Sequence, residues 1–136
     1  MPIFFDSNIL IYAFSNAADH QAKRRLALEL LGRTDWSLSG QVLQEFVSNI
    51  VKLRHGLTAA QAAAAVESIV AHRPVCPVDA ALVLLALEIQ ARYRVSYWDA
   101  AILAAARRMS CGLLFTEDLN HGQDYGGVVA INPFLI

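Results

Sequence analysis

Polar and apolar residues alternate along this chain with two different periods. Apolar-rich segments of strand length lie at residues 2–5, 36–39, 75–78, 113–116 and 127–131. Other segments carry apolar residues at intervals of three and four, the period of a helix with one buried face. These helical segments lie at residues 7–13, 19–31, 41–53, 59–71, 80–89 and 97–109. Alternation of strands and helices predicts an α/β fold, a five-stranded parallel sheet with helices on both faces.

Residues that begin or end helices separate these segments. Thr58 and Asp79 stand just before two of the helices, and both residue types are common N-caps. Gly32 follows the helix at 19–31, and glycine commonly follows a helix end. Pro74 and Pro77 flank the short strand around Cys76. Since proline cannot donate a backbone hydrogen bond, we expect this strand at an edge of the sheet.

The first strand ends in a carboxylate. Asp6 follows Ile3-Phe4-Phe5 directly and precedes Ser7-Asn8, where the first helix is expected to begin. In an open parallel sheet, ligands bind at the carboxyl ends of the strands, so Asp6 occupies a place where function is expected. Aspartate, serine and asparagine are also good helix N-caps. This stretch alone therefore leaves a capping role and a functional role open.

Three more acidic residues are expected at the same edge of the sheet. Asp118 comes just after the apolar strand that ends at Thr116, Asp99 lies in the first turn of helix 97–109, and Glu45 lies in the first turns of helix 41–53. Each has a structural alternative. Asp99 could complete a capping box with Ser96, Asp118 could cap a turn, and Glu45 could be a solvated helix residue. The convergence of all four acids on one edge is more specific than any one of them.

Four carboxylates in one pocket repel one another, and this repulsion raises their pKa values. Hard divalent cations such as Mg²⁺ and Mn²⁺ relieve it, because they prefer oxygen ligands and keep several of their own waters. One or two such ions can activate a water and neutralise a phosphoryl group. The pattern therefore predicts a metal site formed by Asp6, Glu45, Asp99 and Asp118.

Composition restricts the class of protein. The chain has 136 residues, which suits one domain spanning residues 1–136. A formal net charge of -1 permits binding to nucleic acid without indicating it, and basic pairs such as Arg24-Arg25 are candidate phosphate contacts. Hydrophobic residues make up 56% of the chain, so we expect part of its apolar surface to meet a partner.

The chain also carries signals of its location. No uncharged apolar run reaches the length of a membrane helix. The start of the chain lacks the basic region of a signal peptide. Cys76 and Cys111 have no metal-binding spacing; they could form one disulfide, but buried free thiols of a cytosolic protein are favoured. We therefore expect a cytoplasmic protein with no membrane segment.

Four short motifs occur in order along the chain. They are Asp6-Ser7-Asn8, Gln41-Val42-Leu43-Gln44-Glu45-Phe46, Tyr97-Trp98-Asp99-Ala100 and Thr116-Glu117-Asp118-Leu119. Their order and spacing closely resemble the PIN-domain family, and within it the VapC-type toxins of bacterial type II toxin–antitoxin pairs. The resemblance runs from Ile3 to Phe134. It implies a five-stranded parallel sheet in the order 3-2-1-4-5 and Mg²⁺- or Mn²⁺-dependent cleavage of RNA.

The resemblance also implies a role for each motif residue. Asp6 and Asp99 would be the main metal ligands, and Glu45 and Asp118 would complete the cluster directly or through water.

Asn8 and Thr116 would orient the ligands or the attacking water. Many family members carry a further Asp two residues after the fourth acid, where this chain has Asn120, and a second metal site would be weak for that reason. The implied partners are an RNA substrate, a cognate antitoxin protein and a second copy of the chain.

Other functions on a similar sheet fit the sequence less well. A phospho-signalling receiver needs a lysine after the last strands, and the lysines here are Lys23 and Lys52. A phosphatase with an Asp nucleophile would need a second Asp at position 8. A non-catalytic RNA- or partner-binding domain of the same fold is the remaining alternative. Four retained acids argue against it, since carboxylates repel phosphate unless a metal intervenes.

Overall fold

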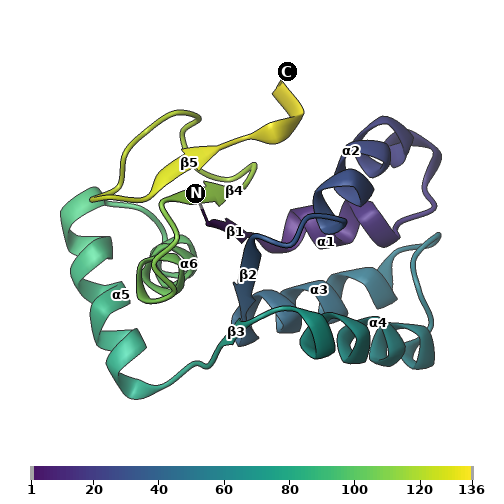
Figure 1. The fold of residues 1–136 in the computed structure, drawn as a ribbon, viewed down its shortest axis with the longest axis horizontal. Coiled ribbons are helices and arrows are strands. Elements are labelled where there is room, and N and C mark those ends of the chain that lie inside the picture. The colour runs from purple at the N-terminus through teal and green to yellow at the C-terminus, as the bar shows by residue number, and fades with distance from the viewer. Residues whose placement is uncertain (1, 136) are drawn as a thin grey trace.

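A computed structural model describes residues 2–135 as an α/β fold built on a parallel sheet (Figure 1). Within these residues the strands are β1 (Ile3–Phe5), β2 (Trp36–Ser39), β3 (Val75–Cys76), β4 (Leu113–Phe115) and β5 (Val129–Ile131). Their order is β3-β2-β1-β4-β5, and each neighbouring pair is parallel. Both the α/β class and the order 3-2-1-4-5 are confirmed. The order reverses between β1 and β4, which makes that junction the switch point of the sheet.

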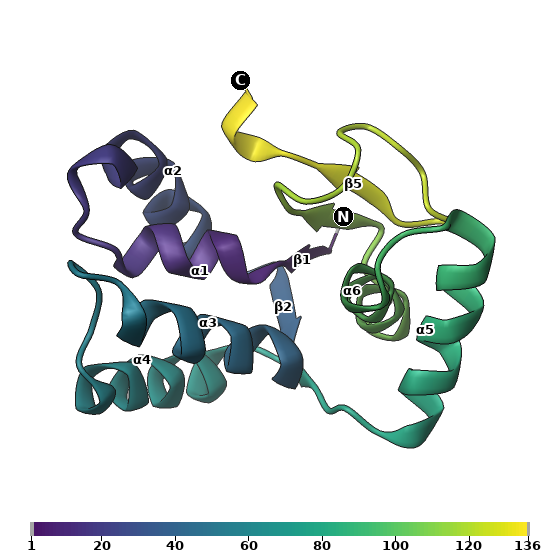
Figure 2. The same cartoon turned by 180° about the vertical axis from the view of Figure 1, so that it is seen from behind.

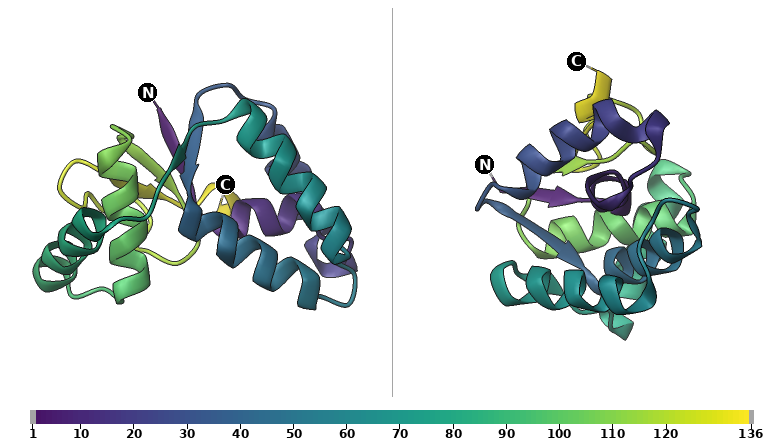
Figure 3. Two further views of the ribbon diagram at one scale, coloured as in Figure 1. Left: turned by 90° about the horizontal axis from the view of Figure 1, so that it is seen from below. Right: turned by 90° about the vertical axis from the view of Figure 1, so that its right-hand side faces the viewer.

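Helices lie on both sides of the sheet. They are α1 (Ser7–Phe14), α2 (Gln21–Leu31), α3 (Gly40–Lys52), α4 (Ala59–His72), α5 (Ala80–Tyr93) and α6 (Tyr97–Arg108), with short 3-10 turns η1 (Ala18–His20) and η2 (Pro133–Leu135). Helix α1 packs against α2 and α3, α3 packs against α4, and α5 packs against α6. Figure 2 shows these two groups on opposite sides of the strands, and the view from below in Figure 3 shows the same separation.

Helix α6 has more buried residues than any other helix within residues 2–135. The seven residues Ala100 to Ala106 are all buried, and they run along one side of β2 and β4. Five of the seven are alanine, whose small side chain allows neighbouring backbones to approach closely. Because these seven residues are buried on every side of the helix, the turn before them, which contains Asp99, is held in a fixed position at the carboxyl ends of the strands.

Most element boundaries agree with the sequence to within two residues, whereas α5 runs four residues further than expected, to Tyr93, and the differences at β5 and β3 have local causes. Strand β5 begins at Val129 instead of residue 127, since Gly126 and Gly127 adopt φ angles of 74° and 102°, which turn the chain. Strand β3 has two residues instead of four. It ends before Pro77, which has no backbone N–H for the ladder, and it lies at the edge of the sheet as expected.

Two further expectations can be compared with the structure. Cys76 and Cys111 are free and buried. Among residues 2–135, none of the helices is both long and apolar enough to cross a membrane.

Candidate active site

Asp6 lies at the carboxyl end of β1 and is also the N-cap of α1. Its carboxylate accepts hydrogen bonds from the Ser7 backbone N–H at 2.7 Å and from the Thr116 hydroxyl at 2.7 Å. Its own backbone N–H donates to the Phe115 carbonyl of β4 at 3.0 Å, so the pairing of β1 with β4 continues to this residue. The capping role and a functional role are therefore compatible, because the hydrogen bonds that cap the helix also fix the carboxylate.

Asp6 carries an electrostatic penalty in this position. The side chain is only 4% exposed, and burial raises its pKa from 3.8 to about 7. Hydrogen bonds from Thr116 and Ser7 lower the pKa, whereas the charges of Asp118 and Glu45 raise it further. An ionised carboxylate that is buried without an opposite charge destabilises the fold. The site is consequently one where a cation would be strongly favoured.

Thr116 and Asn8 connect Asp6 to Asp118. The Thr116 hydroxyl, which donates to Asp6, also accepts the Asp118 backbone N–H at 3.0 Å. The Asn8 side-chain amide donates to the Asp118 carboxylate at 3.4 Å. The other end of that amide, Oδ1, is buried and has no hydrogen-bond partner. Unpaired buried acceptors are rare, and one on the side chain that donates to Asp118 fits a bound water or cation.

Glu45 and Asp99 approach the same place from helix starts. Burial raises the pKa of Glu45, with further contributions from the charges of Asp118 and Asp99 and an opposing hydrogen bond from Gln41. Burial also raises the pKa of Asp99, with an opposing hydrogen bond from the Ser96 side chain and a further contribution from the charge of Asp118. All four acids therefore belong to one electrostatic group, in which Asp118 is close enough to act on each of the other three.

The capping box expected at Asp99 is only half formed. The Asp99 backbone N–H donates to the Ser96 hydroxyl at 3.1 Å, which caps α6. In α4, by contrast, the box is complete, since Gln61 reaches back to the Thr58 backbone. The Ser96 cap uses the backbone of Asp99, so its carboxylate is available for another role.

The four acids act on one another electrostatically, but their side chains do not form a complete set of ligands for a metal ion. Among residues 2–135, no three His, Cys, Asp or Glu side chains converge enough to hold one ion between them. None of the ion pairs in the same residues includes Asp6, Glu45, Asp99 or Asp118. The donor set is hard oxygen throughout, which suits Mg²⁺ or Mn²⁺, ions that complete their coordination with water.

A second network, missed in the sequence, holds the loop after β4. Glu117 accepts a hydrogen bond from the Tyr12 hydroxyl and forms an ion pair with Lys23 at 2.7 Å. The Lys23 ammonium also lies 4.7 Å from the centre of the Tyr12 ring. Glu117 therefore contacts α1 and α2, whereas Thr116 before it and Asp118 after it belong to the acidic site. In the sequence, the available indication of this network was the charged residue Glu117 between the motif positions Thr116 and Asp118.

Asn120 and His121 take part in loop structure. The Asn120 amide donates to the Gln123 side chain at 2.8 Å. The exposed His121 ring accepts the Asn132 backbone N–H at 2.9 Å. Neither side chain is hydrogen-bonded to the four acids.

Comparisons with known proteins agree with this architecture. VapC20 of Mycobacterium tuberculosis, described as a sarcin–ricin loop cleaving toxin, is 27% identical, with a TM-score of 0.66 over 85% of this chain and 91% of that chain. DNA-bound VapBC from Salmonella typhimurium is 19% identical, with a TM-score of 0.65 over 96% of both chains. A toxin–antitoxin complex from Klebsiella pneumoniae is 21% identical, with a TM-score of 0.63 over 93% and 95%.

The similarities to the Salmonella typhimurium and Klebsiella pneumoniae structures show a shared fold alone. A comparison with curated protein sequences found no match. A family model described as the PIN domain matches residues 3–123, which include β1, the switch point and all four acids. This chain belongs to the PIN-domain family.

Proposed function

We propose that this protein is a divalent-metal-dependent endoribonuclease, the toxin of a type II toxin–antitoxin pair. The observation that carries the proposal is the group formed by Asp6, Glu45, Asp99 and Asp118. These acids come from four different elements to the switch point of the sheet, and three of them have raised pKa values there. A purely structural protein has no reason to assemble such a repulsive group.

The side chains present fit a hard divalent cation. Asp6 and Asp99 are proposed as its main ligands, with Glu45 and Asp118 acting directly or through water. Bound there, Mg²⁺ or Mn²⁺ supplies charge neutralisation and activation of a water. A carboxylate has about four acceptor positions, so Asp6 keeps acceptor capacity although Ser7 and Thr116 already donate to it.

The protein's own contribution is positioning. The Thr116 hydroxyl donates to the Asp6 carboxylate, and its oxygen accepts the backbone N–H of Asp118. Both residues are thereby held in position. Asn8 donates to Asp118 and leaves Oδ1 as an acceptor for a water molecule. In the proposed reaction, water attacks an RNA phosphodiester in line with the bond to the 3′ oxygen. The products carry a 5′-phosphate and a 3′-hydroxyl.

RNA and an antitoxin are proposed as partners by similarity. VapC20, which resembles this chain at 27% identity, is described as cleaving the sarcin–ricin loop. Solved neighbours of the same fold are described as toxin–antitoxin complexes. A cytoplasmic location follows from these partners. Helix α5 exposes Val83, Leu84 and Leu87, an apolar face that supports a homodimer.

The proposal is tested by incubating the purified protein with structured RNA in Mg²⁺, in Mn²⁺ and in chelator. Cleavage with either ion and none in chelator is expected, and the new ends are identified by phosphatase and ligase sensitivity. Equal cleavage in chelator contradicts the metal mechanism. RNA binding without cleavage under every condition would instead favour the non-catalytic RNA-binding alternative.

A further inference from the structure

A pocket adjoins the acidic group. It has a volume of about 320 Å³ and lies between α3 and the first turn of α6, lined by Gln41, Gln44, Glu45, Ser48, Asn49 and Trp98. Small-molecule sites have volumes of about 300–1,000 Å³, so this pocket suits a small group such as one ring system. Glu45 belongs both to the pocket and to the acidic group. Whatever fills the pocket is therefore adjacent to the proposed reaction centre.

Trp98 forms the aromatic wall of this pocket. Trp98 is 62% exposed, although burial of a tryptophan ring is strongly favourable. The ring packs edge-on against Tyr97, with centroids 5.3 Å apart and an interplanar angle of 79°. The Trp98 backbone carbonyl accepts the Gln41 side-chain amide at 3.2 Å. The backbone at this residue is thus anchored while most of the indole surface remains accessible.

The opposite wall carries hydrogen-bonding groups on one face of α3. Gln44, Ser48 and Asn49 are all exposed. The Asn49 amide donates one N–H to the Glu45 carbonyl at 2.7 Å, and its oxygen is still free to accept. Amides can both donate and accept, which is the property that reads the edge of a nucleobase. A planar aromatic platform beside amides is the arrangement that proteins use for unpaired bases.

We propose that this pocket binds one unpaired nucleobase of the RNA, next to the phosphate that is cut. The inference rests on the proposed ribonuclease function and deepens it, because it selects single-stranded or loop RNA over duplex. The base stacks on Trp98, and its edge faces Gln44, Ser48 and Asn49. Glu45 excludes a phosphate from the pocket by charge but accepts an exocyclic amino group. Gln44, Ser48 and Asn49 supply hydrogen-bonding groups that favour a base over an apolar partner here, although Trp98 also lines a small adjoining pocket with Val83 of α5.

The direct test uses nucleosides, which have no phosphodiester to cut, and chelator, which removes any metal. Adenosine, cytidine, guanosine and uridine are titrated into the protein while the two indole N–H resonances are followed by NMR. The Trp98 resonance is expected to shift saturably. Trp36 provides the internal comparison, because its ring is buried in the wall of a separate cavity and its N–H already donates to the Leu31 and Arg33 carbonyls. A Trp98 resonance that does not respond to any of the four nucleosides overturns the inference.

A second test uses Trp98→Ala, Trp98→Phe and the control Val70→Ala, which shortens an exposed apolar side chain on α4. Stacking of one base is worth about 1–3 kcal/mol, so Trp98→Ala should weaken affinity for single-stranded RNA about 5- to 150-fold. Trp98→Phe should retain most of that affinity, and Val70→Ala all of it. Unchanged RNA affinity in Trp98→Ala, together with dissociation of a dimer in light scattering, would assign Trp98 to a protein interface instead.

The outcomes separate this inference from the proposed function. If nucleosides shift Trp98 but RNA is never cut, the base pocket stands and the nuclease proposal fails. If RNA is cut in a metal-dependent way while Trp98 neither shifts nor affects RNA affinity, the pocket inference fails alone.

Discussion

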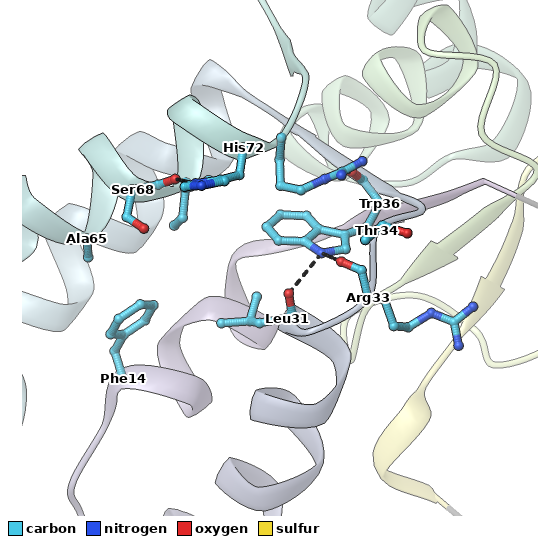
Figure 4. A pocket seen from close by; sticks show the side chains of 10 residues that line it. Phe14, Leu31, Arg33, Thr34, Trp36, Ala65, Ser68 and His72 are labelled. Atoms are coloured by element: carbon cyan, nitrogen blue, oxygen red, sulfur yellow. Dashed lines mark hydrogen bonds between the residues drawn. The ribbon is translucent and has the colours of Figure 1, made fainter.

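The amino ends and the carboxyl ends of the parallel strands differ in how their polar groups are satisfied. At the edge where β2 begins, a cavity of about 460 Å³ lies between α2, β2 and α4, and Figure 4 shows Trp36 in its wall. The Trp36 N–H donates to the Leu31 and Arg33 carbonyls at 3.3 and 2.9 Å. Arg73 donates to the Trp36 carbonyl at 2.7 Å, and its guanidinium lies 5.6 Å from the ring. These polar groups already have partners within the chain.

At the carboxyl ends of the strands, the acids have hydrogen-bond donors but no ion pair with an opposite charge among the described residues. Asp6 is buried with neutral donors only, Asp118 adds a like charge, and Asn8 Oδ1 accepts no hydrogen bond. The comparison teaches that available volume does not identify the functional edge of this molecule. Unsatisfied charge does, because an arrangement that destabilises the fold persists when another role requires it. The cavity at Trp36 is accordingly interpreted as part of the structural framework.

The largest expected effect at the acidic edge comes from Asp99→Asn. The cap of α6 uses the Asp99 backbone, so the fold should survive, but a proposed metal ligand loses its charge. Even outer-shell partners of a metal are worth about 10–100-fold in activity, so RNA cleavage should fall by more than about 100-fold. Asp19→Asn, at an exposed acid in η1, is the matched control. A variant that cuts RNA at the parent rate would make Asp99 a structural residue only.

At the other edge, substitution of Trp36 should change stability and spare the chemistry. Trp36 stacks on Phe5 with centroids 4.7 Å apart, so Trp36→Ala should reduce the free energy of unfolding by about 3–5 kcal/mol. Trp36→Phe should lose less, because it keeps the stacking and leaves only the two carbonyls without their donor. Urea denaturation measures both. Loss of RNA cleavage in a Trp36→Phe protein of parent stability would instead make this edge part of the site.

The pH dependence of stability should report Asp6. Its pKa is raised in the folded state, so between about pH 4 and 7 the folded protein holds more protons than the unfolded chain. In chelator, the free energy of unfolding should therefore fall as pH rises through this window, by on the order of 4 kcal/mol at most. Asp6→Asn should remove most of this slope. A parent protein whose stability rises across the same window would refute the assigned protonation.

A smaller effect is expected from the network at Glu117. The Lys23 side chain is substantially exposed, so Lys23→Met should change stability by less than about 1 kcal/mol. If the ion pair positions the loop between Thr116 and Asp118, kcat for RNA cleavage should fall while KM changes little. Glu117→Gln, which can still accept from Tyr12, should fall less than Glu117→Ala. Equal activity in all three variants would remove this positioning role.

Local patterns were sufficient for the α/β class, since strand and helix periods, with caps such as Thr58 and Asp79, predicted nearly every element. The strand order was predicted from the resemblance to the PIN-domain family, and it is this order that brings the ends of β1 and β4, with Asp6 and Asp118, together. The sequence placed the start of β5 at residue 127, two residues too early, because it does not show that Gly126 and Gly127 both adopt positive φ angles.

Contacts between distant residues were beyond that reasoning. The Lys23–Glu117 ion pair joins residues 94 positions apart, and Tyr12 reaches Glu117 across 105. Such pairs depend on how α1 and α2 settle against the loop after β4. The exposed Trp98 and its neighbours on α3 belong to the same category, because only packing reveals which aromatic residue remains at the surface.

The central claim is that the acids at the switch point form a binding site for a divalent cation. Thermal unfolding of the parent protein and of Asp99→Asn, each in chelator and in a Mn²⁺ titration, tests it most directly. The parent should gain stability with Mn²⁺, by about 2.7 kcal/mol when the free ion reaches 100 times its Kd. Asp99→Asn should melt at or above the parent temperature in chelator, because one charge has left a repulsive group, and should gain little from Mn²⁺. A parent protein whose melting temperature does not respond to Mn²⁺, or an Asp99→Asn protein that responds as the parent does, would contradict the account.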